Sequence, residues 1–194
     1  MIRWPSDLDG AARAFRSAQP FAHLVIDGAV APEALRRMSL AFEEEPQTLV
    51  ENEIYLHLRS SEPPLSEPLR DFCAALQGSC ATVARLCGQP LSRCDGSAYV
   101  YLPGHYLLPH SDSRTSEGRA VAYAFYLDEP AAGGALELFD CERRDGEIVR
   151  TTPAVRIQPR SNRLVLFEVH DLALHQITEV LEGARTSIAG WFYP

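Results

Sequence analysis

The second half of the chain carries the pattern that most restricts its fold. Beyond residue 90, short runs rich in Val, Tyr, Phe, Leu and Ile alternate with turn signals such as Pro103-Gly104, Gly133-Gly134 and Asp145-Gly146. The pattern predicts strands near 97–102, 119–127, 135–139, 147–157, 163–169, 174–181 and 184–192. Strands so numerous and so short do not suit a parallel sheet built from strand-helix-strand units. The second half is therefore expected to form a β-barrel or a β-sandwich.

The first half has a different periodicity. Residues 21–28 read as a short apolar strand, and Pro32 then opens a helical pattern that runs to Glu45. A second helical pattern covers residues 65–88 and ends at a Gly and a Pro. The segment 46–64, which contains three prolines, is expected to be a surface flap that covers a site. Three cysteines of the second helix fall seven residues apart on one stripe without other ligand types, so we interpret them as small buried hydrophobes: Cys73, Cys80 and Cys87.

Composition removes several classes of function. The 194 residues are enough for one domain, and all 18 basic residues are Arg, which excludes Schiff-base lysine chemistry, a pyridoxal-phosphate lysine and a Walker A loop. The net charge of -8 argues against nucleic acid or an anionic membrane as a partner. The chain has no apolar run of about 18 residues, no apolar signal-peptide core and no C-x-x-C pair. A cytoplasmic location in a reducing compartment is the resulting expectation.

One pair of residues suggests a metal site. In His110-Ser-Asp112 an imidazole and a carboxylate stand two residues apart, and alternate side chains of an extended segment point the same way. A second histidine would complete the arrangement of two histidines and one carboxylate that binds Fe(II) and leaves coordination positions open. His175 is the candidate for that ligand. His170, beside Asp171 in an expected turn, is the alternative.

His175 is favoured because of Arg185, ten residues later. Glu182-Gly183 marks a turn, so the two residues are expected to be neighbours across a hairpin, separated by a gap of roughly 13 to 20 Å. A small dicarboxylate fits such a gap. The planar fork of Arg185 suits a carboxylate, and Ser187 on the same face adds a hydroxyl donor.

Three other histidines have no comparable arrangement. His105 follows Gly104 and either faces a substrate or, more simply, stabilises a turn. His23 and His57 have no partner in the sequence and receive no function at this point.

Taken together, these residues resemble a known family. The matching motifs, in order, are Tyr101–Asp112 (YLPGHYLLPHSD), Arg119–Asp128, Gly133–Phe139, His175–Val180 and Arg185–Phe192. Their order and spacing are similar to those of the Fe(II)- and 2-oxoglutarate-dependent dioxygenases of the prolyl 4-hydroxylase type. The resemblance covers residues 97–193.

The resemblance implies a fold and a site. The fold class would be α+β, mainly β: a double-stranded β-helix (jelly roll) flanked by N-terminal helices. Residues 1–194 would form a single domain, with helical support mainly in 30–90 and the jelly-roll core in 91–194. Iron would be bound by His110, Asp112 and His175. Arg185 would bind the distal carboxylate of 2-oxoglutarate, with Ser187, Tyr126 and Tyr101 in the same pocket, and Trp191 either walls the site or belongs to the core.

The resemblance also implies the reaction. Fe(II), 2-oxoglutarate and O2 would be used, with ascorbate as a candidate reductant, to hydroxylate an unactivated C–H group. Asp112 favours hydroxylation because the related halogenases carry a small residue at that position. The expected substrate is a prolyl or other amino-acyl side chain of a protein or peptide, walled by segment 46–64 and by the loop at 113–118 with Arg114, Glu117 and Arg119.

Three alternatives remain open at this point. The first is a hydroxylase of a free amino acid or a natural-product intermediate, because fold-level resemblance does not decide the substrate. The second is a non-catalytic jelly-roll module that binds a structural ion, although such an ion needs no carboxylate anchor. The third is a cupin-type dioxygenase that uses no 2-oxoglutarate. The sequence predicts no oligomeric state.

Overall fold

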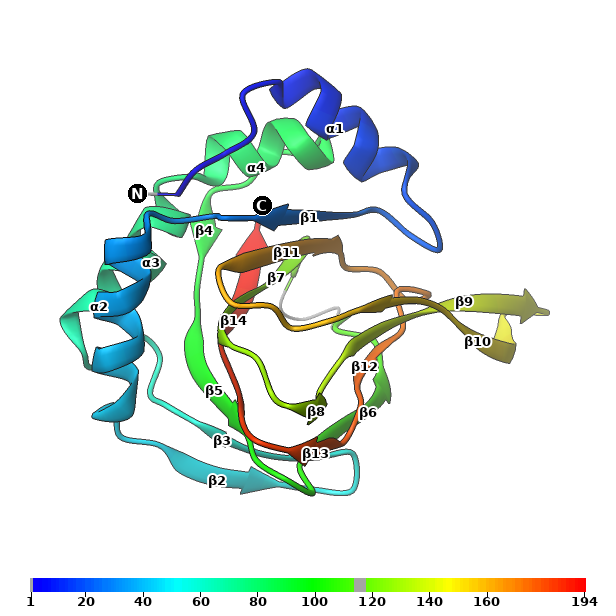
Figure 1. Ribbon diagram of the computed structural model, residues 1–194. Coiled ribbons are helices and arrows are strands. Elements are labelled where there is room, and N and C mark those ends of the chain that lie inside the picture. Colours follow the sequence, from blue (N-terminus) through cyan, green and yellow to red (C-terminus); the bar gives the residue numbers. More distant parts are fainter. Residues whose placement is uncertain (1, 114–117) are drawn as a thin grey trace.

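The computed structural model describes residues 2–113 and 118–194, and it consists of a curled β-sheet with helices against its outer side (Figure 1). The helices in this part of the chain are α1 (Leu8–Ser17), α2 (Pro32–Glu43), α3 (Glu67–Gln77) and α4 (Cys80–Cys87). None of them is long and apolar enough to cross a membrane.

The strands are mostly antiparallel neighbours that lie far apart in the sequence. They are β1 (His23–Asp27), β2 (Thr48–Glu51), β3 (Tyr55–Arg59), β4 (Arg93–Cys94), β5 (Ser97–Tyr101), β6 (Tyr106–His110), β7 (Val121–Asp128), β8 (Ala132–Gly133), β9 (Leu136–Arg144), β10 (Glu147–Ile157), β11 (Arg163–Glu168), β12 (His175–Ile177), β13 (Val180–Glu182) and β14 (Arg185–Tyr193). The main sheet has the order β1-β11-β7-β14-β5-β3-β6-β12-β9-β10, with β2 paired to β3 and β4 to β14. β8 and β13 form a separate pair. This is the mainly β, jelly-roll architecture that the sequence predicted.

Strand β7 explains why the sheet has a core on one side and a cavity on the other. Its side chains alternate, as in any strand, so that Tyr123, Phe125 and Leu127 join the core beneath the helices. The alternate positions Ala122 and Ala124 face the interior of the curled sheet. Because these inward side chains are small, the concave face retains an open volume.

The helical half differs from the prediction at two places. The single helix expected over 65–88 is two helices, because Gly78 and Ser79 interrupt it and the Ser79 amide bonds back to the Leu76 carbonyl in a tight turn. Helix α1 was not anticipated. It is capped by Asp7, whose side chain accepts a hydrogen bond from the Gly10 amide at 2.8 Å, and Phe15 anchors it in the core.

Segment 46–64 is part of the sheet, so the prediction of a surface flap was wrong. β2 and β3 form a hairpin, and β3 is inserted between β5 and β6. The insertion puts Tyr55, His57 and Arg59 on the concave face, where they line the cavity. The segment therefore forms a fixed wall of the site.

The predicted hairpin between His175 and Arg185 was also wrong. The expected strand 174–181 is broken into β12 and β13, and β12 pairs with β6 and β9. β14 instead pairs with β5 and β7, on the other side of the curled sheet. The chain therefore crosses between two walls of the jelly roll, and the sheet's curvature directs both side chains into one space.

Candidate functional site

The concave face of the sheet encloses a cavity of about 840 Å³. Its walls come from β2, β3, β4, β5, β6, β7, β9, β11, β12 and β14, so residues from almost the whole length of the sheet converge there. His110, Asp112, His175, Arg185 and Ser187 all line it. A volume of this size suits a small ligand together with part of a larger one.

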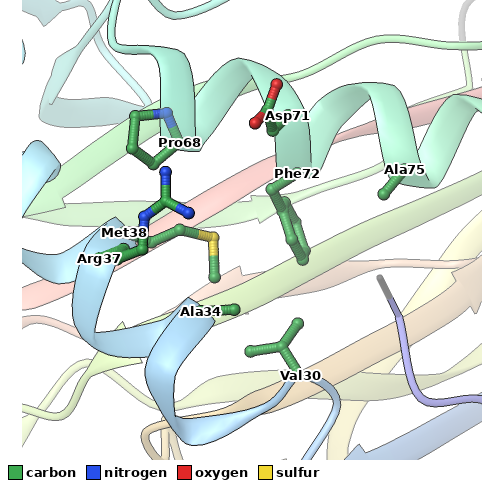
Figure 2. A pocket seen from close by; sticks show the side chains of 8 residues that line it. All are labelled: Val30, Ala34, Arg37, Met38, Pro68, Asp71, Phe72 and Ala75. Atoms are coloured by element: carbon green, nitrogen blue, oxygen red, sulfur yellow. The ribbon is translucent and has the colours of Figure 1, made fainter.

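A smaller pocket of about 160 Å³ lies between α2 and α3, outside the curled sheet (Figure 2). In Figure 2, Met38 and Phe72 point toward each other across the gap between the helices. Its charged lining residues are Arg37 and Asp71, and no His or Cys lines it. This pocket therefore offers no group of metal-ligating side chains.

His110, Asp112 and His175 form a compact group in the larger cavity. One ligand atom of each lies within 4.8 Å of the others. His110 Nε2 is 3.5 Å from Asp112 Oδ1, and His175 Nε2 is 3.6 Å from Asp112 Oδ2. The register of the sheet causes this approach, because His175 on β12 is directly opposite His110 on β6. The structure thus brings together the three residues that the sequence proposed as ligands.

Both imidazoles are held in the orientation that metal binding needs. His110 Nδ1 donates to the Leu108 carbonyl at 2.9 Å, and His175 Nδ1 donates to the Ala173 carbonyl at 3.2 Å. A carbonyl oxygen only accepts, so the proton is on Nδ1 and the Nε2 lone pair faces the group's centre. Two imidazole nitrogens and one carboxylate therefore converge there.

The surroundings favour the charge states that suit a cation. Burial lowers the pKa of His175 to about 4, which keeps this 4 % exposed imidazole neutral at pH 7. Burial alone would raise the pKa of Asp112. The hydrogen bond that the Trp191 indole donates to the carboxylate acts against burial, and the Asp112 pKa is held below its usual range. Asp112 is therefore ionised.

The carboxylate of Asp112 has further partners. Trp191 Nε1 donates to Asp112 Oδ2 at 2.8 Å, and Arg119 Nη1 lies 3.8 Å from Asp112 Oδ1. The Arg119 guanidinium stacks 3.6 Å above the Trp191 ring. Trp191 therefore walls the site, as one of the two sequence interpretations proposed, and it also orients a candidate ligand.

The segment after His110 is tied to the loop before His175. The Ser111 hydroxyl donates to the His170 carbonyl at 3.0 Å, and the Ser113 hydroxyl donates to Asp171 at 2.7 Å. These two bonds hold the segment that carries Asp112 against the loop that leads into β12. The spacing of the three candidate ligands is thus fixed by contacts between sequence-distant loops.

Arg185 is a second charged feature of the cavity. It is 2 % exposed, and among the described residues no acidic side chain forms an ion pair with it. Arg185 Nη1 donates to the Ser187 hydroxyl at 3.3 Å, and the Tyr101 and Tyr126 rings each lie 4.9 Å from its guanidinium carbon. Burying a cation is costly unless an anion accompanies it. The geometry therefore indicates an anion site.

Two buried polar atoms beside the guanidinium support this interpretation. Arg185 Nε and the Tyr126 hydroxyl have no hydrogen-bond partner among the described residues. Buried polar groups are nearly always paired, so unpaired ones in a cavity wall indicate a ligand. Arg185, Ser187, Tyr126 and Tyr101 are thus assembled as the sequence resemblance implied.

The remaining sequence candidates lie apart from this group. His170 accepts a hydrogen bond from the Leu172 amide in its own loop and does not line the cavity. His105 is in a turn, where its carbonyl accepts from the Val180 amide. Arg114 and Glu117 lie outside the described residues. The cysteines are free, and burial raises the pKa of Cys73 to about 12, so it is an inert thiol.

Sequence reasoning missed His57. It lies on β3 among three tyrosines and lines the cavity, but its sequence context offered no partner. The available signal was the alternation of Tyr55, His57 and Arg59, which places polar side chains on one face of a strand.

The donor set fits Fe(II). Two imidazole nitrogens and one carboxylate on one side of an open cavity are the facial ligands of non-haem iron, which leave positions for other molecules. The buried guanidinium in the same cavity fits a cosubstrate that carries a second carboxylate.

Comparison with known proteins agrees with this chemistry. The family model of the 2OG-Fe(II) oxygenase superfamily matches residues 96–193. The chain therefore belongs to this family of oxygenases, which use Fe(II), 2-oxoglutarate and O2.

Individual relatives are prolyl hydroxylases. The chain is 31% identical over 188 residues to the prolyl 3-hydroxylase OGFOD1 of Mus musculus, a match that covers 90% of this chain and 33% of the mouse protein. It thus spans about a third of the length of that relative. Its fold is similar to a Pseudomonas putida prolyl-4-hydroxylase, with a TM-score of 0.74, 18% identity and coverage of 94% and 98% of the two chains.

A third similar protein is a Trichoplax adhaerens prolyl hydroxylase in complex with a hypoxia-inducible-factor peptide fragment. Its TM-score is 0.71 at 15% identity, with 98% of this chain and 94% of that chain covered. At this level of identity the likeness shows the shared fold.

Proposed function

We propose that the protein hydroxylates a prolyl side chain of a protein or peptide in a reaction that consumes 2-oxoglutarate and O2. The observation that carries the proposal is that one cavity holds both a metal-ligating group and a buried arginine. The prolyl specificity draws on the relatives, of which the mouse protein is a prolyl 3-hydroxylase.

In this proposal His110, Asp112 and His175 hold Fe(II). The backbone carbonyls of Leu108 and Ala173 fix the two imidazoles, so little reorganisation is needed when iron binds. Bound iron would supply the oxidation by activating O2, while 2-oxoglutarate is decarboxylated to succinate. The protein's part is to fix the ligands and to leave one side of the metal open.

Arg185 binds the distal carboxylate of 2-oxoglutarate through its planar fork. Ser187 accepts one N–H of the guanidinium and so orients it, and the rings of Tyr101 and Tyr126 confine it. The Tyr126 hydroxyl, which has no hydrogen-bond partner in the described part of the chain, is positioned to donate to the same carboxylate.

The remaining cavity takes the substrate side chain. The β2–β3 hairpin contributes Val50, Ile54 and Tyr55, whose apolar surface suits a pyrrolidine ring. Arg119 also lines this cavity, next to Asp112. A peptide that lies across this opening presents one side chain to the metal.

The first experiment is an anaerobic titration of the Fe(II)-loaded protein with 2-oxoglutarate, followed by the visible charge-transfer band of the metal-bound 2-oxo acid. Appearance of the band supports the site. Absence of the band although metal is bound contradicts the dioxygenase mechanism. The alternatives that then remain are a cupin-type dioxygenase that uses no 2-oxoglutarate and a non-catalytic module that binds a structural ion.

The second experiment presents a library of proline-containing peptides in air. The expected result is a peptide that gains one oxygen atom at a proline, with one succinate formed for each. Hydroxylation of free amino acids instead of peptides would contradict the proposed substrate class.

A further inference from the structure

His57 is a buried titratable residue that the proposed mechanism leaves without a role. It is 7 % exposed on β3, and it lines the same cavity as Arg185. Its Nδ1 is enclosed and has no hydrogen-bond partner among the described residues. A phenylalanine would fill the same space without an unpaired polar atom, so the imidazole requires an explanation.

The register of three strands places His57 at the level of the cosubstrate anchor. Arg185 on β14 is directly opposite Tyr101 on β5. On the other side of β5, Leu58 is opposite Val100, which puts His57 level with Tyr101. Arg185, Tyr101 and His57 thus form one row across three adjacent strands.

The side chains of this row are in contact. The His57 ring stacks on the Tyr101 ring with centroids 5.1 Å apart and an angle of 30° between planes. The Arg185 guanidinium carbon lies 4.9 Å from the same Tyr101 centroid. Because the sheet is curled, inward-pointing side chains from one level converge toward its axis.

The imidazole is neutral and therefore keeps one N–H donor. Burial, with the positive charges of Arg59 and Arg185 nearby, lowers the pKa of His57 to about 4. A neutral donor beside Arg185 adds a hydrogen bond for an anion without burying a second cation.

We infer that His57 is a cosubstrate-binding residue, whose ring N–H donates to the distal carboxylate of 2-oxoglutarate beside Arg185. This inference rests on the proposed function, because it needs 2-oxoglutarate in this cavity. If so, the β2–β3 hairpin helps to bind the cosubstrate and also lines the part of the cavity that takes the substrate.

The test compares two ligands in two proteins. Fe(II)-loaded wild type and His57→Phe are titrated anaerobically with 2-oxoglutarate and with 2-oxobutyrate, a 2-oxo acid that lacks the distal carboxylate. Phe retains the stack on Tyr101 and removes the nitrogens. The charge-transfer band reports binding of both acids without turnover.

The expected result is that His57→Phe weakens 2-oxoglutarate binding about tenfold, as loss of a hydrogen bond to a charged group should. Binding of 2-oxobutyrate stays unchanged. The thermal midpoint of the metal-free variant stays the same or rises, because an unpaired buried group is removed. His23→Phe, on β1 outside the cavity, is the matched control and should bind both acids as wild type does.

Two results would overturn the inference alone: His57→Phe binds 2-oxoglutarate as tightly as wild type, or it loses affinity for both acids equally. If wild type itself gives no band with 2-oxoglutarate, the proposed function fails, and this inference fails with it. Should His57→Phe not fold, His57→Leu carries the test, because Leu also lacks a donor and should weaken 2-oxoglutarate binding about tenfold. His57→Gln, which keeps an N–H donor, should bind within threefold of wild type.

Discussion

The indole nitrogen of Trp191 donates a hydrogen bond to Asp112 Oδ2 at 2.8 Å, so the last strand of the sheet holds the candidate carboxylate ligand in place. Removing such a partner of a metal ligand typically costs about ten- to a hundredfold in metal affinity. We expect Trp191→Phe to weaken Fe(II) binding by about tenfold in a competition titration. Trp4→Phe is the control, because its indole bonds to Ser79 away from the cavity. Equal Fe(II) affinity in wild type and Trp191→Phe would contradict the role of this bond.

The assignment of the third ligand is tested by two histidine variants. His175→Ala should lose stoichiometric Fe(II) binding and turnover, because two protein ligands remain. His170→Ala, which changes the rejected alternative, should keep one iron per chain. Metal analysis after gel filtration measures both, with circular dichroism to check folding. Iron retained by His175→Ala but lost by His170→Ala would reverse the assignment.

The cosubstrate anchor is tested by steady-state kinetics. Arg185→Gln removes the charge that we assign to the distal carboxylate, and the KM for 2-oxoglutarate should rise about a hundredfold. Ser187→Ala should raise that KM by about threefold, because Ser187 acts by orienting Arg185. Arg163→Gln removes a guanidinium that pairs with Asp27 outside the cavity, and it should leave the KM unchanged. A KM unaffected in Arg185→Gln would rule out the anchor.

His57 should also make the stability of the metal-free protein depend on pH. Its pKa is about 4 in the folded protein and near 6.5 when unfolded, so between these values the unfolded chain binds more protons. The stability that the neutral His57 ring contributes to the folded protein is therefore fully present above pH 6.5 and is lost as the pH falls toward 4. We expect the thermal midpoint to fall less between pH 7 and 5 in His57→Phe than in wild type. Parallel plots of thermal midpoint against pH for the two proteins would show that His57 is not held neutral. The groups that face its ring are Arg59, His105, Arg185, Tyr55, Tyr99 and Tyr101.

Gly190 allows the last strand to pass close to the main chain at Asp95. A Cβ at Gly190 would lie 2.2 Å from the Asp95 carbonyl oxygen, so Gly190→Ala must shift one of the two segments. We expect a loss of on the order of 2 kcal/mol in the free energy of unfolding, measured by urea denaturation. Gly78→Ala, whose Cβ would meet nothing closer than 3.4 Å, should change stability by less than about 1 kcal/mol. Equal stabilities of the two variants would contradict the close approach.

Local spacing was enough to find part of the site. His110 and Asp112 share a face because they are two residues apart in an extended segment, and this relation needs no knowledge of the rest of the fold. The jelly-roll class followed from the density of strands and from the resemblance. These features depend on short stretches of sequence, where the backbone geometry is regular.

The features that escaped prediction depend on which strands pair. His175 and Arg185 were expected on neighbouring strands, whereas β12 and β14 lie on different walls. The insertion of β3 between β5 and β6 brings His57 against Tyr101, 44 positions away in the sequence. Strand order is set by the packing of the whole sheet, so no local pattern reveals it.

The place of β3 in the sheet also affects how the chain can be divided. The region that defines the family begins at residue 96, yet β3 (Tyr55–Arg59) lies between two of that region's strands, and β1 (His23–Asp27) covers the edge of a third. A fragment that starts at residue 96 would have three strands with unpaired backbone edges, which promote aggregation. We therefore expect the region from residue 96 onward and the helical half before it to form one folding unit. The two parts should stay together in evolution, in expression and in engineering.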